Sequence, residues 1–131
     1  MRLFDANCSK RISFILATKN RALFLEKALA SHRKLIGPYD ELIVVDGGSK
    51  DDTLRVIKEN SDIVQKFVSE EDISEGHAVN KGVLLASGKY IKLLTDDDYF
   101  YREAIEKAVR IMEKNPQIDI LLAGGTKHHG E

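Results

Sequence analysis

Three consecutive aspartates, Asp96, Asp97 and Asp98, follow an apolar run in the stretch LLTDDDYF, residues 93–100. Carboxylates this close together repel one another, so the pattern points to a positive charge that offsets the repulsion. Mg²⁺ and Mn²⁺ prefer oxygen ligands, and they usually take one or two protein carboxylates together with water and phosphate oxygens. The alternative is a solvated acidic turn in which Asp98 caps the following helix. The three aspartates alone favour neither interpretation.

A second polar segment, VVDGGSKDDT, spans residues 44–53. Asp46 ends an apolar run, and Gly47 and Gly48 allow the backbone to turn sharply and to approach a ligand. A carboxylate in this position could accept hydrogen bonds from a nucleobase N–H or from ribose hydroxyls. The alternative is an ordinary turn between a strand and a helix. Neither of the glycine-rich phosphate-binding patterns is present in this segment.

A third segment, EGHAVNKG at residues 75–82, carries Asn80 and Lys81 in one predicted helical turn. Lys81 could neutralise a phosphate, and Asn80 could hydrogen-bond a ligand or a neighbouring loop. We interpret His77 as a surface residue. The adjacent pair His128 and His129 is interpreted in the same way, rather than as a metal site.

Apolar runs and helical patterns alternate along the chain. The apolar runs predict strands at residues 12–17, 41–46, 63–68, 89–94 and 118–123, and the periodic segments predict helices at residues 21–35, 49–60, 75–87 and 102–115. This order predicts an α/β fold with a mostly parallel sheet and helices on both faces. Ligands of such sheets bind beyond the carboxyl ends of the strands. Residues 18–21, Asp46 and Asp96 should therefore meet at one edge.

Local patterns add detail to these elements. In the first helix, Leu25, Ala28, Leu29 and His32 share one face at helical spacing. Ser49 stands three residues before Asp52, which predicts a variant capping box at the start of the second helix. Gly88 is placed to end the third helix. The 102–115 helix should present Ile105, Ala108, Val109 and Met112 on one face and end before Pro116.

The composition is that of an ordinary globular domain. The chain has 131 residues, of which 43% are hydrophobic and 31% charged, and its net charge of −1 with no basic block gives no support for nucleic-acid binding. The single cysteine, Cys8, excludes an internal disulfide and fits a reducing compartment. No apolar run is long enough to span a membrane. We therefore expect a cytoplasmic location, with association at the cytoplasmic face of a membrane left open.

Three segments in this order resemble the family 2 glycosyltransferases, which use nucleoside-diphosphate sugars and have the Rossmann-like GT-A fold. The matching stretches are ATKNRALFLEKAL (17–29), ELIVVDGGSKDDT (41–53) and EGHAVNKGVLLASGKYIKLLTDDD (75–98). The similarity extends from about Arg11 to Asp119. It implies transfer of a sugar from a nucleoside-diphosphate donor to a hydroxyl-bearing saccharide or lipid-linked acceptor, with inversion, in polysaccharide, cell-wall or glycolipid synthesis.

The resemblance also implies roles for individual residues. The residues that it implies for nucleotide-sugar binding are Thr18, Asn20, Arg21, Asp46, Gly48, Ser49, Asn80, Lys81 and Asp96. Asp46 would contact the base and Asp96 the ribose. Asp97 and Asp98 would hold Mn²⁺ or Mg²⁺ on the donor diphosphate. Two registers of the family's acidic motif are open: Asp96 and Asp98 as Asp-x-Asp, or Asp96 and Asp97 as an adjacent pair.

Two departures from the family pattern matter. Many members carry Asp-Asp-Gly-Ser where this chain has Asp46-Gly47-Gly48-Ser49, so one carboxylate on the base side is missing. In addition, the family's general base lies further along the chain than residue 131. We therefore expect residues 1–131 to form a single nucleotide-sugar-binding domain, the N-terminal part of a longer glycosyltransferase domain, with the catalytic base outside it.

Three other functions fit the same fold less well. A non-catalytic nucleotide-sugar-binding module would keep the fold without turnover. A sugar nucleotidyltransferase usually carries a glycine-rich basic loop after the first strand, where this chain has Ala17-Thr18-Lys19-Asn20-Arg21. A phosphoacceptor receiver domain expects paired acids at the same place.

Overall fold

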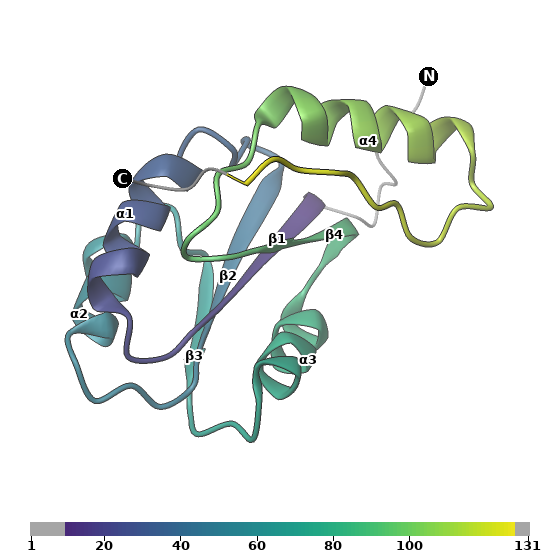
Figure 1. Cartoon of the computed structure of the whole chain (residues 1–131). Helices are drawn as coiled ribbons and strands as arrows, with labels where there is room; N and C mark the ends of the chain where they lie inside the picture. Colours follow the sequence, from purple (N-terminus) through teal and green to yellow (C-terminus); the bar gives the residue numbers. More distant parts are fainter. Residues whose placement is uncertain (1–9, 128–131) are drawn as a thin grey trace. The chain divides into compact units, whose positions relative to one another are not determined.

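The computed structural model describes residues 10–127, which form two compact units divided between Phe100 and Tyr101. Cys8, His128 and His129 lie outside the described residues. Figure 1 shows the chain. The first unit contains the sheet and the polar segments identified in the sequence, so it carries the candidate site.

The first unit is a parallel four-stranded sheet with the order β3-β2-β1-β4. Its elements along the chain are β1 (Lys10–Thr18), α1 (Ala22–His32), β2 (Asp40–Asp46), α2 (Thr53–Glu59), β3 (Lys66–Ser69), α3 (Glu75–Leu85) and β4 (Gly88–Leu94). The predicted alternation of strands and helices is confirmed for these elements. The α/β fold class is confirmed with it.

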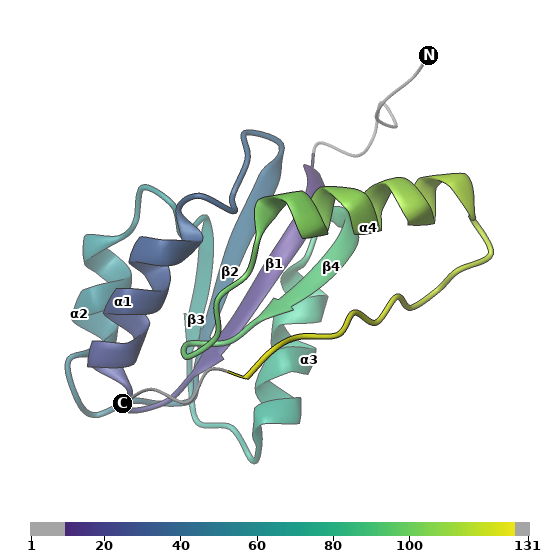
Figure 2. The ribbon, with the colours of Figure 1, turned by 45° about the horizontal axis from the view of Figure 1, so that its top comes forward.

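The helices cover both faces of this sheet. The crossovers through α1 and α2 carry the chain toward β3, whereas α3 returns it to the other edge, so right-handed connections place α3 on the opposite face. Figures 1 and 2 show α1 and α2 side by side and α3 apart from them. Side chains alternate along each strand, so both faces of the sheet are apolar where a helix covers them.

The core on the α3 face contains Ile15, Ile43 and Val45 from the strands and Ala78 from the helix, all buried. The alternate residues Phe14, Leu16, Leu42 and Val44 are completely buried on the other face. Helix α1 buries Leu25, Ala28, Leu29 and His32, which are the residues predicted from the helical spacing. The first helix is thus positioned by its apolar face, as the sequence predicts.

The register of the sheet brings three strand ends into line. Thr18 pairs with Asp46, and Asp46 pairs in turn with Ser69 at the end of β3. On the other side of β1, Leu16 pairs with Leu94, so the residues that follow β4 emerge beside Thr18. The predicted convergence of residues 18–21, 46 and 96 at one edge is confirmed.

Two local predictions are wrong. Gly88 does not end the third helix, which stops at Leu85; it is the first residue of β4, and its N–H donates to Ser13 Oγ (2.8 Å). A Cβ at this position would lie 2.7 Å from both the backbone nitrogen and the Oγ of Ser13. Gly88 is needed because β4 approaches β1 too closely for a side chain at this position. It plays no role in ending α3.

The predicted capping box is also absent. The N-cap of α2 is Asp52, whose side chain makes no capping hydrogen bond, and Ser49 donates instead to Asp46. Asp51 takes over the start of the helix, where its Oδ1 accepts hydrogen bonds from the N–H (3.0 Å) and Oγ1 (2.5 Å) of Thr53. The Asp51 carboxylate can accept a hydrogen bond from the free N–H at the start of the helix, whereas the Ser49 hydroxyl is already hydrogen-bonded to Asp46.

The second unit begins at Tyr101 and contains α4 (Arg102–Lys114), which ends before Pro116 as predicted. The predicted strand at residues 118–123 is not formed. Ile120 and Leu122 are 79% and 90% exposed. A strand exists only through hydrogen bonds to a neighbour, and within residues 10–127 this segment pairs with no other strand. Its apolar composition alone therefore misled the prediction.

Among the helices of residues 10–127, none combines the length and the apolar character needed to cross a bilayer.

Candidate functional site

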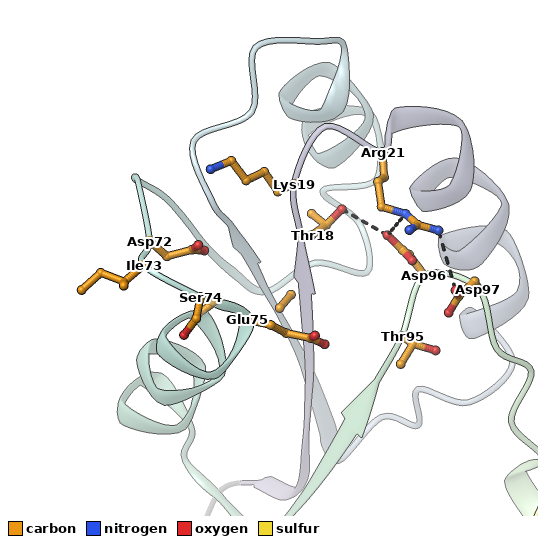
Figure 3. A pocket seen from close by; sticks show the side chains of 12 residues that line it. Thr18, Lys19, Arg21, Asp72, Ile73, Ser74, Glu75, Thr95, Asp96 and Asp97 are labelled. Atoms are coloured by element: carbon orange, nitrogen blue, oxygen red, sulfur yellow. Dashed lines mark hydrogen bonds and ion pairs between the residues drawn. The ribbon is translucent and has the colours of Figure 1, made fainter.

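A cavity of about 610 Å³ opens at the carboxyl ends of β1 and β4, within the first unit. Figure 3 shows the side chains around it. The cavity is lined by Ala17, Thr18, Lys19, Arg21, Asp72, Ile73, Ser74, Glu75, Ala78, Thr95, Asp96 and Asp97. These residues come from the end of β1 and the loop after it, from the loop after β3 and the first turn of α3, and from the loop after β4. The position agrees with the rule that parallel sheets bind ligands at their carboxyl ends.

An ion pair joins two of these loops. Arg21 Nε lies 3.0 Å from Asp96 Oδ2, and Arg21 Nη2 lies 3.7 Å from Asp97 Oδ2. The Nε contact is electrostatic rather than a well-aligned hydrogen bond. Thr18 Oγ1 is 3.5 Å from the same Asp96 oxygen, and the guanidinium carbon of Arg21 stacks 4.3 Å from the ring centre of Phe24. Arg21 thus supplies a positive charge beside the acidic run.

Burial raises the pKa of the Asp96 carboxyl above its usual value, although the nearby Arg21 guanidinium acts in the opposite direction. Only 10% of the Asp96 side chain is exposed, compared with 56% for Asp97. The two neighbouring carboxylates therefore differ: Asp96 is enclosed and paired, whereas Asp97 reaches solvent at the rim of the cavity.

Asp98 takes part in a turn with Thr95. Thr95 Oγ1 donates to Asp98 Oδ2 (2.7 Å) and accepts from the Asp98 N–H (3.2 Å). Asp98 does not cap the following helix, because the N-cap of α4 is Tyr101. The alternative in which Asp98 caps the following helix is thereby excluded.

Asp97 and Asp98 also line a second cavity of about 210 Å³, together with residues of α1 and Tyr99.

The carboxylates of the acidic run suit a hard divalent cation that is held partly by the protein and partly by a bound phosphate group. Within residues 10–127, no three or more His, Cys, Asp or Glu side chains are arranged to enclose a metal ion. Mg²⁺ and Mn²⁺ are commonly bound by only one or two carboxylates, with phosphate and water oxygens as further ligands. The exposed carboxylates of Asp97 and Asp98 fit that requirement.

His32 supports the acidic loop from below. Its ring is fully buried, and Nε2 donates to the carbonyl oxygen of Thr95 (3.0 Å). Its ring centre lies 5.9 Å from that of Phe100. Burial lowers the pKa of His32, against the effect of the Thr95 carbonyl, which raises it. Helical spacing predicts that His32 lies on the apolar face of α1, but it does not predict this contact, which joins residues 63 positions apart.

Asp46 is completely buried and is occupied by neighbouring side chains. Its Oδ2 accepts from the Ser49 N–H (3.0 Å) and from Ser69 Oγ (2.6 Å), and its Oδ1 accepts from Ser49 Oγ. Gly48 has a φ of +82°, the left-handed region that favours glycine, and this lets the chain fold back onto the carboxylate. Asp46 holds together the turn after β2 and does not line the cavity.

Asn20 and Ser49 connect the loops after β1 and β2. Asn20 has a φ of +51°; its N–H donates to Ser49 Oγ (2.7 Å), and its Oδ1 accepts from the Lys50 N–H (2.8 Å). Asparagine tolerates the left-handed region better than most residues with a side chain. Neither side chain lines the cavity, so the structure places both residues beside the pocket as supports for its loops.

Asn80 and Lys81 lie on α3, away from the cavity lining. Lys81 Nζ donates to the Glu71 carbonyl oxygen (3.1 Å) and pairs with Glu70 Oε1 (3.1 Å). Asn80 is exposed. Lys81 therefore supports the loop between β3 and α3, and the structure does not bring Asn80 or Lys81 to the other predicted site residues.

The loop after β3 and the start of α3 contribute lining residues that the sequence did not predict, among them Asp72, Ser74 and Glu75. Ser74 caps α3 by accepting from the His77 N–H (3.2 Å), and His77 Nδ1 accepts from the Ile73 N–H (3.1 Å). The signal was available, because β3 ends at the same edge as β1 and β4. It was overlooked because β3 is short and begins at Lys66, three residues after the predicted start.

The sequence profile of glycosyl transferase family 2 matches residues 13–125, which is most of the chain. The chain belongs to glycosyl transferase family 2. An uncharacterized glycosyltransferase of Rickettsia conorii is 33% identical over 116 residues, 87% of this chain and 19% of the relative. The poly-beta-1,6-N-acetyl-D-glucosamine synthase of Staphylococcus epidermidis is 32% identical over 111 residues, 82% of this chain and 26% of that protein. The predicted family is confirmed.

Solved structures show the same fold. The family 2 chain superposes on S. aureus TarS 1-349 in complex with UDP-GlcNAc with a TM-score of 0.70 and 22% identity, covering 81% of this chain and 32% of that chain. For the mannosyltransferase of Pyrobaculum calidifontis in complex with GDP-Man and Mn²⁺, the TM-score is 0.68 at 25% identity, with 78% and 32% covered. The predicted GT-A fold is confirmed.

The chain spans only part of its relatives, between 19% and 36% of the first four curated glycosyltransferases that it matches.

Proposed function

We propose that this family 2 glycosyltransferase binds a nucleoside-diphosphate sugar in the cavity beyond β1 and β4 and transfers the sugar to a hydroxyl acceptor. The observation that carries the proposal is the cavity itself, which holds Thr18, Arg21, Asp96 and Asp97 together in a chain of this family. The ligands bound in two solved structures with this fold, UDP-GlcNAc and GDP-Man, belong to the proposed class of donor.

The polar groups of the cavity suit a nucleotide sugar. The Arg21 guanidinium can bind phosphate oxygens, and the Asp96 carboxylate can accept hydrogen bonds from ribose hydroxyls. The Thr18 hydroxyl lies 3.5 Å from Oδ2 of this carboxylate. We propose Asn20, Gly48 and Ser49 as the residues that shape the loops around the nucleotide. The roles of Asp46, Asn80 and Lys81 in direct contact with the donor stay predictions.

Asp97 and Asp98 would hold Mn²⁺ or Mg²⁺ at the rim of the cavity. When bound, the cation would neutralise negative charge on the leaving diphosphate. The positive charge would also relieve repulsion between the two carboxylates. Mn²⁺ in the complex of the P. calidifontis mannosyltransferase supports a divalent cation here.

The chain's own contribution to transfer is to bind and orient the donor. The ion pair of Arg21 with Asp96 and the contact of His32 with the Thr95 carbonyl hold the acidic loop in place before the donor arrives. Pre-organised groups need little rearrangement during reaction. We also propose that the transfer inverts the sugar and that the acceptor is a saccharide or is linked to a lipid. In this proposal, residues 1–131 are the N-terminal donor-binding part of a longer domain, which is located in the cytoplasm.

Calorimetry tests the proposal. UDP and GDP are titrated into the purified protein with Mn²⁺, with Mg²⁺ and with EDTA, and circular dichroism confirms that the sample is folded. We expect binding of at least one nucleotide that tightens at least about tenfold with the cation. A folded sample that binds neither nucleotide in the presence of Mn²⁺ contradicts the proposal. Metal-dependent binding without sugar transfer from any donor would favour the non-catalytic module.

A further inference from the structure

The carboxylates near the cavity differ in whether they are already occupied. Asp96 and Asp97 pair with Arg21, and both oxygens of Asp46 accept hydrogen bonds from serines. Asp72 and Glu75 also line the cavity, but neither forms a hydrogen bond or ion pair with another residue of 10–127. Their oxygens are the acceptors that a ligand can use without displacing an existing contact.

Asp72 occupies the space of a missing side chain. Residue 47 is glycine, and a Cβ built there would lie 2.6 Å from Asp72 Oδ2, 3.2 Å from Oδ1 and 3.1 Å from Cγ. Real Cβ atoms are essentially never found as close as 2.6 Å, so with a side chain at position 47 the Asp72 carboxylate would have to move from this place. Gly47 therefore makes room for a carboxylate that comes from the loop after β3.

This arrangement returns a carboxylate to the end of β2. Gly47 directly follows Asp46, and its N–H donates to the Thr18 carbonyl oxygen (2.9 Å), which fixes it beside the end of β1. Figure 3 shows the Asp72 carboxylate directed toward Thr18, on the side of the cavity away from Arg21 and Asp96. A carboxylate from the loop after β3 thus stands beside the end of β2 and faces the cavity.

Lys19 complements Asp72. Lys19 lines the same cavity and forms no ion pair with a residue of the described range 10–127. An ammonium group only donates hydrogen bonds, and an ionised carboxylate only accepts them. Together they match a ring N–H next to a carbonyl oxygen. Uracil and guanine present that pair of groups on one edge, whereas adenine and cytosine present a bare ring nitrogen next to an amino group.

We propose that Asp72 is the residue that recognises the nucleobase, by accepting a hydrogen bond from the ring N–H of uracil or guanine. The proposal rests on the proposed donor-binding function and names the specificity determinant within it. Glu75 is the weaker candidate, because it is the first residue of α3, where the helix dipole already stabilises a negative charge.

The test compares four nucleotides on matched variants. UDP, GDP, ADP and CDP are titrated calorimetrically, in Mn²⁺, into wild type, Asp72→Asn, Asp72→Ala, Glu75→Gln and Glu71→Gln. Glu71 serves as the control because it neighbours Asp72 in the same loop but does not line the cavity. Urea unfolding of each variant verifies the fold, and the two substitutions at position 72 provide independent measurements.

We expect wild type to bind UDP or GDP at least about tenfold more tightly than ADP and CDP. Asp72→Asn and Asp72→Ala should lose about 10- to 100-fold of that affinity, the range for a hydrogen bond to a charged group, and with it the preference among bases. Glu71→Gln should bind as wild type does.

Two results would overturn the inference alone: unchanged affinity and base preference in both Asp72 variants, or a loss in Glu75→Gln in their place. Wild type that binds none of the four nucleotides would overturn the proposed function, and this inference with it.

Discussion

Arg21 and Asp96, which are far apart in the sequence, form an ion pair at one side of the cavity, with 3.0 Å between Arg21 Nε and Asp96 Oδ2. The pair connects the loop after β1 with the loop after β4. Its positive partner also reaches Asp97, a proposed metal ligand. A nucleoside diphosphate and a cation would thus enter a site where Arg21 already offsets part of the negative charge. Arg21 should therefore affect the affinity for the metal and the affinity for the nucleotide separately.

Replacing Arg21 should change metal and nucleotide affinity in opposite directions. In Arg21→Met, Asp96 and Asp97 lose their positive neighbour, so Mn²⁺ alone should bind more tightly. The increase should be up to about fivefold, because the Arg21–Asp97 pair next to the proposed metal site is exposed to solvent. UDP or GDP in Mn²⁺ should bind more weakly, because a phosphate partner is lost. Electron paramagnetic resonance of free Mn²⁺ and calorimetry measure the two affinities.

Arg33→Met is the matched control for this prediction, because Arg33 pairs with Asp62 outside the cavity. The control should change neither affinity. Equal Mn²⁺ affinity in wild type and Arg21→Met would contradict the prediction.

Asp97→Asn and Asp98→Asn should each weaken metal-assisted nucleotide binding by at least about tenfold, because each removes a charged oxygen ligand. Both side chains are exposed, so the free energy of unfolding should change by no more than about 0.5 kcal/mol, or rise slightly as repulsion falls. Calorimetry with and without Mn²⁺, together with urea unfolding, provides both measurements. Wild-type binding by both variants would show that the acidic run is only a turn.

Glu41 stabilises the opposite end of the sheet. It is 1% exposed, its Oε1 accepts from Ser13 Oγ (2.6 Å) and the Ser87 N–H (2.7 Å), and its Oε2 lies 3.0 Å from Lys66 Nζ. These donors, against the cost of burial, lower the pKa of Glu41 to about 2. The ionised group should contribute on the order of 3 kcal/mol of stability, fully present above pH 4.5 and lost as the pH falls through about 2.

Urea unfolding from pH 7 to pH 2 checks this prediction. Glu41→Gln should be less stable at pH 7 by about 2–4 kcal/mol, and its stability should depend less on pH below 4.5. Glu59→Gln removes an exposed carboxylate paired with Arg55 and should cost no more than about 0.5 kcal/mol. The prediction fails if the two variants behave alike.

His32 should give a second, higher pH window. Because burial lowers its pKa, the folded protein binds the proton less readily than the unfolded chain. Stability should be complete above about pH 6.5 and should decrease as the pH falls from there through the folded-state pKa. His32→Leu should abolish this window and cost about 1–3 kcal/mol at pH 7, since the Thr95 carbonyl loses its donor.

NMR titration of the His32 ring and urea unfolding between pH 8 and pH 5 measure the effect. A His32 ring that titrates at or above 6.5, or a His32→Leu variant with the wild-type pH dependence, would contradict it.

Gly88→Ala should destabilise the protein by about 1–3 kcal/mol, because the added methyl group would press on the Ser13 backbone. Gly76→Ala is the matched control: its nearest contact would be Ser74 Oγ at 3.7 Å, within α3, and alanine there should stabilise the helix by about 0.5–1 kcal/mol. Thermal unfolding of both variants measures the two changes. Equal effects on the melting temperature would rule out the close approach of β4 to β1.

Much of this architecture was already determined by the sequence. The face of α1 and the positions of β1, β2 and β4 follow from periodicity, which depends only on neighbouring residues. The meeting of Thr18 with Asp96 follows from the general rule for the ends of parallel strands. Family membership was visible for the same reason, since the three diagnostic segments each lie in a continuous stretch.

The tertiary structure alone decided which polar groups are available to a ligand. Asp46 is enclosed by serines, whereas Asp72 reaches the space left by Gly47 and remains unpaired within residues 10–127. The apolar segment at residues 118–123 forms no strand in that range. Hydrogen-bond partners depend on the exact distances between segments far apart in the chain, and residue type and local spacing do not specify those distances.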